Sequence, residues 1–301
     1  MKAFALCCFL LNTMLWATFY AVSKEALTRI DNFVFSFLEV GSLLPAVAVI
    51  LCVSWRRERA AFTRGLVLRG VKLGGVLALA IFTSTLALKH TTATNTAFFP
   101  SLNGIMAALI ARGLLKRPIA GATWIAGLVA SAGALLLIFE GPINGADWRG
   151  DLIALLAAFF YTCYIFQVDH DIHQEDASPW PLFGIELATM IVLTGLGAAL
   201  LGDWSAVHPV FPKDIFVVLY IGFGTTLLPT AISIFMQKRV SPVTVAFLYV
   251  FEPIWSAVLA RLYLGEALTL RGYLGAALII SGALMHTWHA VKPANAALAE
   301  V

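Results

Sequence analysis

Long apolar segments recur from one end of this 301-residue sequence to the other. A helix that crosses the hydrocarbon core of a bilayer needs roughly 20 such residues in a row. Hydrophobic residues make up 60% of the chain and charged residues only 12%. Inside a bilayer the backbone groups of a lone segment find partners only within a helix. The sequence therefore predicts an all-α integral membrane protein without a soluble domain.

Ten segments are long enough to cross a bilayer, and short polar connections separate them. They cover residues 4–23, 32–54, 69–88, 93–113, 119–139, 150–168, 180–201, 213–236, 243–263 and 270–290. The sequence thus predicts ten transmembrane helices, which are numbered below as spans 1 to 10.

Lysines and arginines gather in the loops on one side of these spans. If the N-terminus is cytoplasmic, thirteen of the 20 lie on the inside and seven on the outside. Most of the difference comes from one loop, SWRRERAAFTRG (54–65). Short cytoplasmic loops are the ones enriched in Lys and Arg. We therefore expect both termini to be cytoplasmic, with residues 292–301 as a short tail.

The chain repeats itself after 149 positions. Residues 75–138 align with residues 224–287 without a gap and share 14 identities. Spans 3 to 5 thus match spans 8 to 10. By spacing, span 1 matches span 6 and span 2 matches span 7. The sequence predicts two units of five spans, at residues 1–140 and 150–291.

An odd number of spans in each unit turns the second unit upside down relative to the first. Inverted repeats of this kind are an architecture of secondary transporters, whose substrate site lies near the midplane at the repeat interface. The sequence therefore predicts a 5+5 fold around a central cavity, and transport by alternating access.

Two segments resemble a known family. LYVFEPIWSAVLARLYLGEALTLRGYLGAALIISGALM (248–285) is similar to the closing signature of the drug/metabolite transporter superfamily, EamA type, with Glu252 and Pro253 at its Glu-Pro pair. LWATFYAVSK (15–24) resembles the first helix of that family, with Trp16 at its tryptophan. With the length, the span count and the repeat, the resemblance covers nearly the whole chain.

The resemblance implies export of amino acids or similar small metabolites across a bacterial inner membrane. Amino-acid exporters of the YddG kind are one group of the superfamily. Two alternatives stay open, an intramembrane enzyme that acts on a lipid-like substrate and a small-molecule channel. Neither a P-loop nor a G-x-S-x-G motif occurs in the sequence. We therefore expect no enzyme activity and no cofactor. We also expect no metal site, because the cluster DHDIHQED (169–176) lacks the H-x-x-x-H or H-E-x-x-H spacing of a helix-borne site.

Polar and aromatic residues inside the spans are the candidates for substrate binding. Glu252 lies about 15 Å into span 9 at 1.5 Å per residue, where an ionisable group is costly. It would bind a substrate ammonium or a coupling proton, or bond a neighbouring helix. Aromatic faces suit cationic and amphipathic substrates, but the rings also serve for packing. The predicted substrate-binding residues are Trp16, Tyr20, Asn95, Phe98, Phe99, Asn103, Tyr161, Tyr249, Glu252 and Trp255.

Two prolines and two further glutamates are predicted to act in gating. Pro229 and Pro253 each remove a hydrogen bond from a helix, which produces a hinge or a static kink. Glu39 and Glu186 are 147 positions apart and close to the repeat spacing. They would lie at access paths on opposite sides, or else extend into the headgroup region.

Small residues recur at helical spacing in spans 5 and 10. This pattern is typical of close helix packing, and a homodimer through these two spans is the alternative. The residues are Gly121, Ala126, Ala130 and Ala134 in span 5, and Gly272, Gly275 and Gly282 in span 10.

Overall fold

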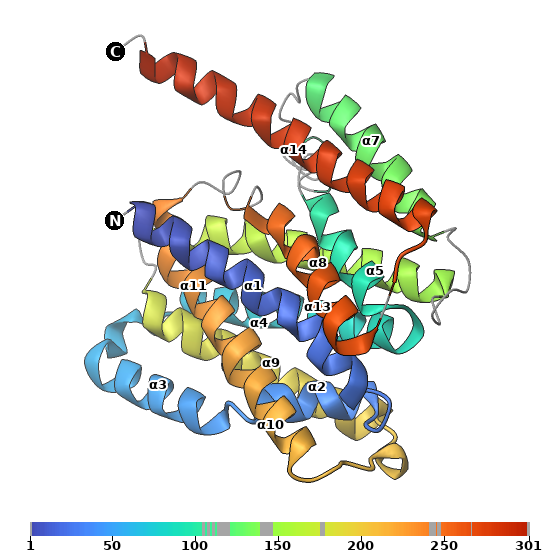
Figure 1. Cartoon of the computed structure of the whole chain (residues 1–301). Coiled ribbons are helices and arrows are strands. Elements are labelled where there is room, and N and C mark those ends of the chain that lie inside the picture. Colours follow the sequence, from blue (N-terminus) through green and yellow to red (C-terminus); the bar gives the residue numbers. More distant parts are fainter. Residues whose placement is uncertain are drawn as a thin grey trace.

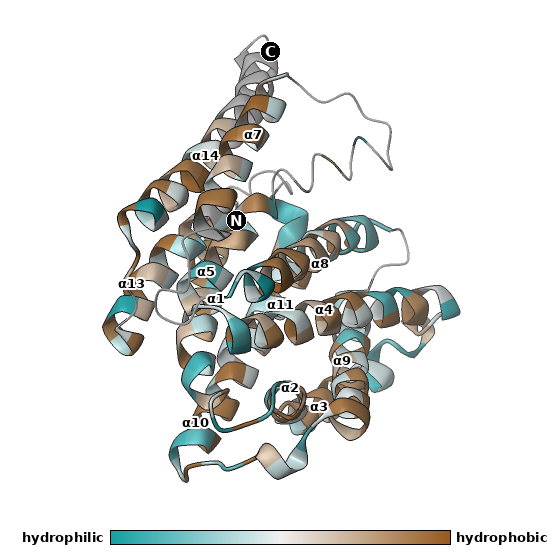
Figure 2. Ribbon diagram, turned by 90° about the vertical axis from the view of Figure 1, so that its right-hand side faces the viewer, coloured by the Kyte–Doolittle hydropathy of each residue, from teal (hydrophilic) through white to brown (hydrophobic). Residues whose placement is uncertain are grey.

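A computed structural model shows the chain as a bundle of helices. It describes residues 2–103, 106, 109, 112, 121–138, 147–174, 178–240, 245, 248–265 and 267–299. These residues form helices and the turns between them, with no strand among them. Hydrophobic residues dominate the helices, and hydrophilic residues gather at helix ends and connections (Figure 2). The predicted all-α fold class is confirmed.

A helix lies in each of the ten predicted ranges (Figure 1). The first half contains α1 (Lys2–Ala26), α2 (Asn32–Gly41), α3 (Leu44–Arg57), α4 (Arg64–His90), α5 (Ala93–Phe98) and α7 (Gly121–Ile138). The second half contains α8 (Trp148–Ile172), α9 (Pro179–Leu201), α10 (Lys213–Tyr220), α11 (Leu228–Met236), α13 (Glu252–Leu264) and α14 (Leu270–Ala299).

The lengths of these helices decide how many of them can cross a bilayer. Among the described residues, five helices are long and apolar enough to do so, and six if α2 and α3 form one bent span. The count of ten spans therefore stays a prediction.

Span 2 is broken between α2 and α3, which meet at a bend of 44°. Pro45 lies in the first turn of α3, where its missing N–H leaves no bond unmade. The Ser42 N–H donates to the carbonyls of Leu38 and Val40, and the Ser42 Oγ donates to the Glu39 carbonyl at 2.6 Å. The bend therefore satisfies the last carbonyls of α2.

Span 8 accommodates Pro229 in a wider turn. A π-helical turn, η5 (Ile221–Leu227), joins α10 to α11, and Pro229 stands in the first turn of α11. Together with the 3-10 turn that follows, Gln237–Arg239, these three elements form one continuous span over Lys213–Arg239. The kink predicted at Pro229 thus takes the form of a π-helical turn in the residues just before it, a frequent form of helix irregularity at functional sites.

Spans 4 and 9 each contain a 3-10 turn at equivalent places. In span 4 the turn is η2 (Phe99–Leu102), which contains Pro100. In span 9 it is η7 (Tyr249–Phe251), directly before Glu252 and Pro253. Positions 99–102 correspond to 248–251 in the 149-residue repeat. The irregularity of the helix is therefore repeated together with the sequence.

Spans 5 and 10 pack along each other as α7 and α14 (Figure 1). A Cβ atom on Gly133 would lie 2.5 Å from the Gly275 carbonyl oxygen, and one on Gly282 would lie 2.6 Å from that of Ala126. The predicted close packing is confirmed, within a single chain. A homodimer stays a prediction, and it would need other faces of α7 and α14.

Candidate functional site

A small cavity lies where helices of both halves meet. Its lining includes Trp16 and Tyr20 of α1, Tyr161 of α8 and Glu252 of α13. Thr96, Pro100, Ile81 and small residues of α4 and α8 complete it. The space open to the centre of a water-sized sphere is about 20 Å³, which is enough for about one water molecule. The cavity is therefore nearly closed in this conformation.

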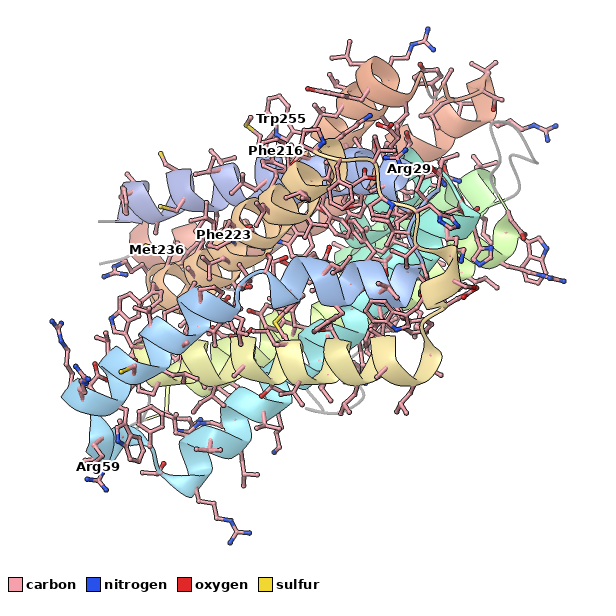
Figure 3. All side chains as sticks on the ribbon, turned by 90° about the horizontal axis from the view of Figure 1, so that it is seen from below. Arg29, Arg59, Phe216, Phe223, Met236 and Trp255 are labelled. Carbon is pink, nitrogen blue, oxygen red and sulfur yellow. The ribbon has the colours of Figure 1, made fainter. Side chains whose placement is uncertain are left out.

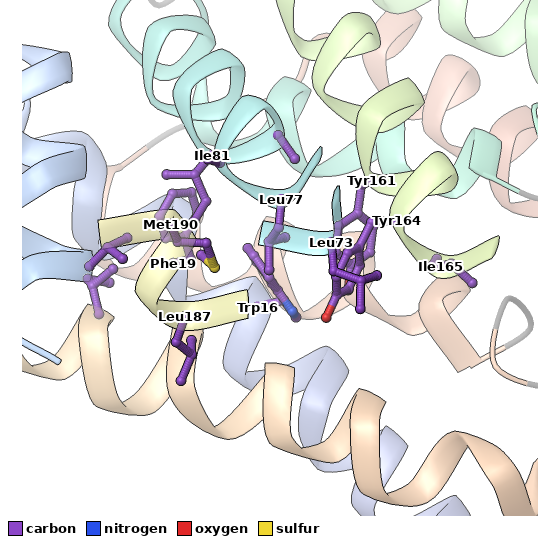
Figure 4. Close-up of a cluster of buried hydrophobic side chains, with 14 of the residues drawn as sticks. Trp16, Phe19, Leu73, Leu77, Ile81, Tyr161, Tyr164, Ile165, Leu187 and Met190 are labelled. Atoms are coloured by element: carbon purple, nitrogen blue, oxygen red, sulfur yellow. The ribbon is translucent and has the colours of Figure 1, made fainter. Parts of the chain in front are cut away.

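Aromatic rings form one wall of this region (Figure 4). The centroids of Trp16 and Tyr161 are 5.4 Å apart, edge to face. Tyr161 also stacks on Tyr164 at 5.9 Å and meets the edge of Tyr249 at 5.6 Å. Trp16 and Tyr161 occupy equivalent positions when span 1 is aligned with span 6. The repeat thus brings equivalent aromatic residues into contact at the cavity.

Hydrogen bonds between distant helices hold the polar groups of the cavity. The Tyr20 hydroxyl donates to Glu252 Oε1 at 2.8 Å, and Glu252 is only 2% exposed. The hydroxyls of Tyr161 and Tyr249 are 2.7 Å apart, and Asn12 Nδ2 donates to the Tyr249 hydroxyl at 3.1 Å. The structure therefore brings Trp16, Tyr20, Tyr161, Tyr249 and Glu252 together, as their prediction as binding residues requires.

The two predicted asparagines join helices near the cavity without lining it. Asn95 Nδ2 donates to Asp151 Oδ1 at 3.1 Å, and the Thr91 hydroxyl donates to the same oxygen at 2.5 Å. The Thr162 hydroxyl donates to Asn103 Oδ1 at 3.1 Å. Asp151 is 1% exposed. It was not predicted as a site residue because it stands at the very start of span 6, where a charged residue is common.

Phe98, Phe99 and Trp255 lie away from the cavity wall. Phe98 and Phe99 pack in a second, smaller core with Ala130 of α7 and Ile279 of α14. Trp255 is 41% exposed on the outside of the bundle (Figure 3). These three aromatic residues fall on other faces of their helices than the one that lines the cavity.

The predicted gating residues are all buried, but they lie in different places. Pro253 follows Glu252 at the start of α13, beside the cavity. Pro229 lies in α11 behind the π turn. Glu39 of α2 and Glu186 of α9 are both 0% exposed, and these two helices pack against each other. Neither glutamate is part of the cavity lining.

A cluster of charges ties together the end of the bundle that is predicted to face outward. Arg29 Nη2 and Nε donate to the Asp214 carboxylate at 2.6 and 3.1 Å. Glu25 pairs with Arg29 at 3.4 Å and with Lys213 at 2.5 Å. The hydrogen bond to Asp214 raises the pKa of Arg29, which stays charged. The connection after α1 is therefore fastened to the start of α10.

Arg29 and Arg59 lie toward opposite ends of the molecule (Figure 3). Arg59 stacks over the Trp55 ring at 5.0 Å, close to the bond between Ser178 and Glu58. The loops after span 1 and after span 2 therefore lie at opposite ends, as alternating spans require.

Comparison with known proteins gives consistent matches. The profile of the EamA-like transporter family matches residues 3–139 and, a second time, residues 148–288. A protein of Archaeoglobus fulgidus named "uncharacterized transporter" is 23% identical over 283 residues, which is 92% of this chain and 95% of that protein. One of Clostridium kluyveri with the same name is 27% identical over 239 residues, 74% of this chain and 73% of that protein.

A solved crystal structure has the same fold. It superposes with a TM-score of 0.66 at 20% sequence identity, over 94% of this chain and 96% of that chain. The structural match and the two profile matches together cover the bundle from α1 to α14.

Proposed function

This chain belongs to the EamA-like transporter family, and we propose that it exports amino acids or similar small metabolites across a bacterial inner membrane by alternating access. The observation that carries the proposal is the cavity between the two halves. Its wall combines aromatic faces with one carboxyl group, Glu252. That combination suits a substrate with an ammonium group and an apolar part.

The size of the cavity supports alternating access. Ligand pockets have volumes of about 300 Å³ or more, far above the space for about one water molecule found here. A substrate can enter only after the helices around the cavity move apart. Rocking of one inverted repeat against the other would produce that opening on one side at a time. In the observed conformation the cavity is therefore too small for such a substrate.

The position of Glu252 supports the proposed role in substrate binding. Its Oε1 is held by the Tyr20 hydroxyl, while Trp16 and Tyr161 line the same space. An ammonium group beside the carboxyl would lie near the faces of these rings, where cation–π attraction adds to the charge interaction. Pro253 and Pro100 place irregular backbone at the same cavity, where it is tolerated in a membrane protein.

The proposal is tested by flux measurements on the purified protein in liposomes. The protein is offered a broad panel of labelled amino acids that includes threonine, methionine and phenylalanine. We expect saturable uptake and counterflow of at least one of them. A channel would conduct without saturation or counterflow. If no member of the panel moves, the proposal is wrong.

The cavity is tested with a matched pair of tryptophan variants. We expect Trp16→Ala to raise the KM for the transported amino acid about tenfold, the loss of a cation–π contact of about 1.4 kcal/mol. Trp255→Ala removes an exposed tryptophan outside the cavity and should leave the KM within about twofold of the wild type. Equal effects of both substitutions would contradict the assignment of the cavity.

A further inference from the structure

Two carboxyl groups in the bundle are fully buried. Glu39 and Glu186 are both 0% exposed, and among the described residues no hydrogen bond of normal geometry reaches any of their four carboxyl oxygens. Glu252 differs because it lines the cavity and receives a bond from Tyr20. Buried polar groups without partners are rare in native structures and call for an explanation.

The two glutamates occupy equivalent places in the two halves. Glu39 is the eighth residue of α2 and Glu186 is the eighth residue of α9. A Cβ atom on Gly222 would lie 2.5 Å from the Glu39 carbonyl oxygen, and a Cβ atom on Gly74 would collide with the Glu186 carbonyl oxygen. In both cases a glycine of the opposite half lets two helices touch at the glutamate. Each half of the chain therefore has one glutamate at a close helix crossing.

The surroundings of the two carboxyl groups favour the neutral acid in this conformation. Among the described residues, no charged side chain interacts with Glu39. Glu186 has two neighbours on α8, the Tyr164 hydroxyl and the Asp171 carboxyl. Tyr164 faces Glu186 without a hydrogen bond of good geometry. A carboxylate without a counter-ion is costly to bury, so burial favours the proton-bound form of both groups in this conformation.

We propose that Glu39 and Glu186 are proton-binding sites, one for each half, and that they couple proton movement to the transport of the substrate. This inference rests on the proposed function and adds the driving ion to it. When one side opens, water reaches the crossing on that side. The O–H bond of the acid then breaks, the proton passes to water, and the electron pair stays on the carboxylate. The group takes up a proton again only from the opposite side, after the protein has changed over with the substrate, so that one proton crosses the membrane in exchange for the substrate.

The inference is tested with a pH gradient across liposomes that contain the full chain. Labelled threonine, methionine and phenylalanine are supplied, and a pH-sensitive dye in the lumen reports proton movement. A gradient of one pH unit supports up to about a tenfold accumulation for each coupled proton. We expect the wild type to accumulate its amino acid and to move protons in the opposite direction, in exchange for it.

The variants Glu39→Gln and Glu186→Gln imitate the neutral acid. Each should keep counterflow at the wild-type rate within about threefold but lose accumulation and proton movement. Glu39→Asp keeps a titratable group and should retain part of the coupling, which guards against a purely structural effect. Asp203→Asn, at an exposed turn, is the control and should couple like the wild type.

The outcomes separate this inference from the proposed function. If the wild type carries amino acids but no pH gradient drives them, the inference is wrong and the proposed function stands. It is equally wrong if both glutamine variants still accumulate the amino acid, or if coupling is lost only in Glu252→Gln. If the wild type moves no amino acid of the panel at all, it is the proposed function that fails.

Discussion

Gly133 of α7 has no space for even one additional methyl group. An added Cβ atom would lie 2.5 Å from the Gly275 carbonyl oxygen and 2.8 Å from the Ile279 nitrogen, so the backbones of α7 and α14 would have to separate. We expect Gly133→Ala to lower the free energy of unfolding by about 1–3 kcal/mol, the usual range for overpacking. Thermal unfolding in detergent should show a melting temperature lower by several degrees.

Gly121 is the matched control on the same helix. Within the described part of the chain, no atom lies within 4 Å of the place where its Cβ would be. Alanine is a better helix former than glycine by up to about 1 kcal/mol. Gly121→Ala should therefore be at least as stable as the wild type, and equal losses at the two glycines would contradict the packing of α7 on α14.

The sequence was informative for single residues where the residue type itself is unusual in a membrane. Trp16, Tyr20, Tyr161, Tyr249 and Glu252 were predicted from aromatic or acidic character, and the structure brings them together. Which face of a helix a residue occupies was harder to predict. Phe98, Phe99 and Trp255 lie on spans that contribute to the cavity, yet they point to other surroundings. A rotation of about 100° per residue separates neighbouring positions, and span boundaries alone do not fix it.

An ion pair between Arg29 and Asp214 joins the connection after α1 to the start of α10. The Asp214 side chain is 1% exposed and that of Arg29 is 23% exposed. We expect Arg29→Gln to lower the stability by about 1–3 kcal/mol, because a buried carboxylate loses its charged partner. Thermal unfolding measures this loss, and Arg271→Gln, at an exposed position of α14, should have no measurable effect.

A second substitution tests the cause of that loss. In the double variant Arg29→Gln with Asp214→Asn, the unpaired buried charge is gone, so part of the stability should return. If the double variant is less stable than Arg29→Gln alone, the loss has another origin than the unpaired carboxylate.

The elements themselves were predicted well in position but less well in shape. All ten predicted ranges contain a helix, because apolar length is a strong signal. The bend in span 2 had a usable signal, since Gly41 and Pro45 surround it. Two other features of the helices had no such signal in the sequence. The π turn before Pro229 and the extension of α8 to Ile172 depend on neighbouring helices that the local sequence does not specify.

The order of the spans across the membrane is a property of the whole chain and can be measured directly. Ten spans with a cytoplasmic N-terminus place residues 58–62 and the C-terminus inside, and His208 outside. Reporter fusions active on only one side of the membrane should show this pattern. A C-terminus on the side opposite to residues 58–62 would require an odd number of spans between them, and the 5+5 arrangement would then be wrong.

The contacts that unite the two halves were beyond the reach of the sequence. Asn12 and Tyr249 are bonded across 237 positions, and Tyr20 and Glu252 across 232. The repeat indicated that two inverted units face each other, but not the register in which they meet. The register depends on the close crossings, and those depend on how side chains of both halves fit together.

The glycine crossings also have a mechanical consequence. Gly74 lies within α4, which runs from Arg64 to His90, and it brings the α4 backbone directly against the α9 backbone at Glu186. If α4 tilts, it turns about this contact. The helix extends about 24 Å from Gly74 to His90, at 1.5 Å per residue. A tilt of only about 10° about this point would carry the end of the helix by about 4 Å, a shift comparable to the diameter of the side chains that close the cavity.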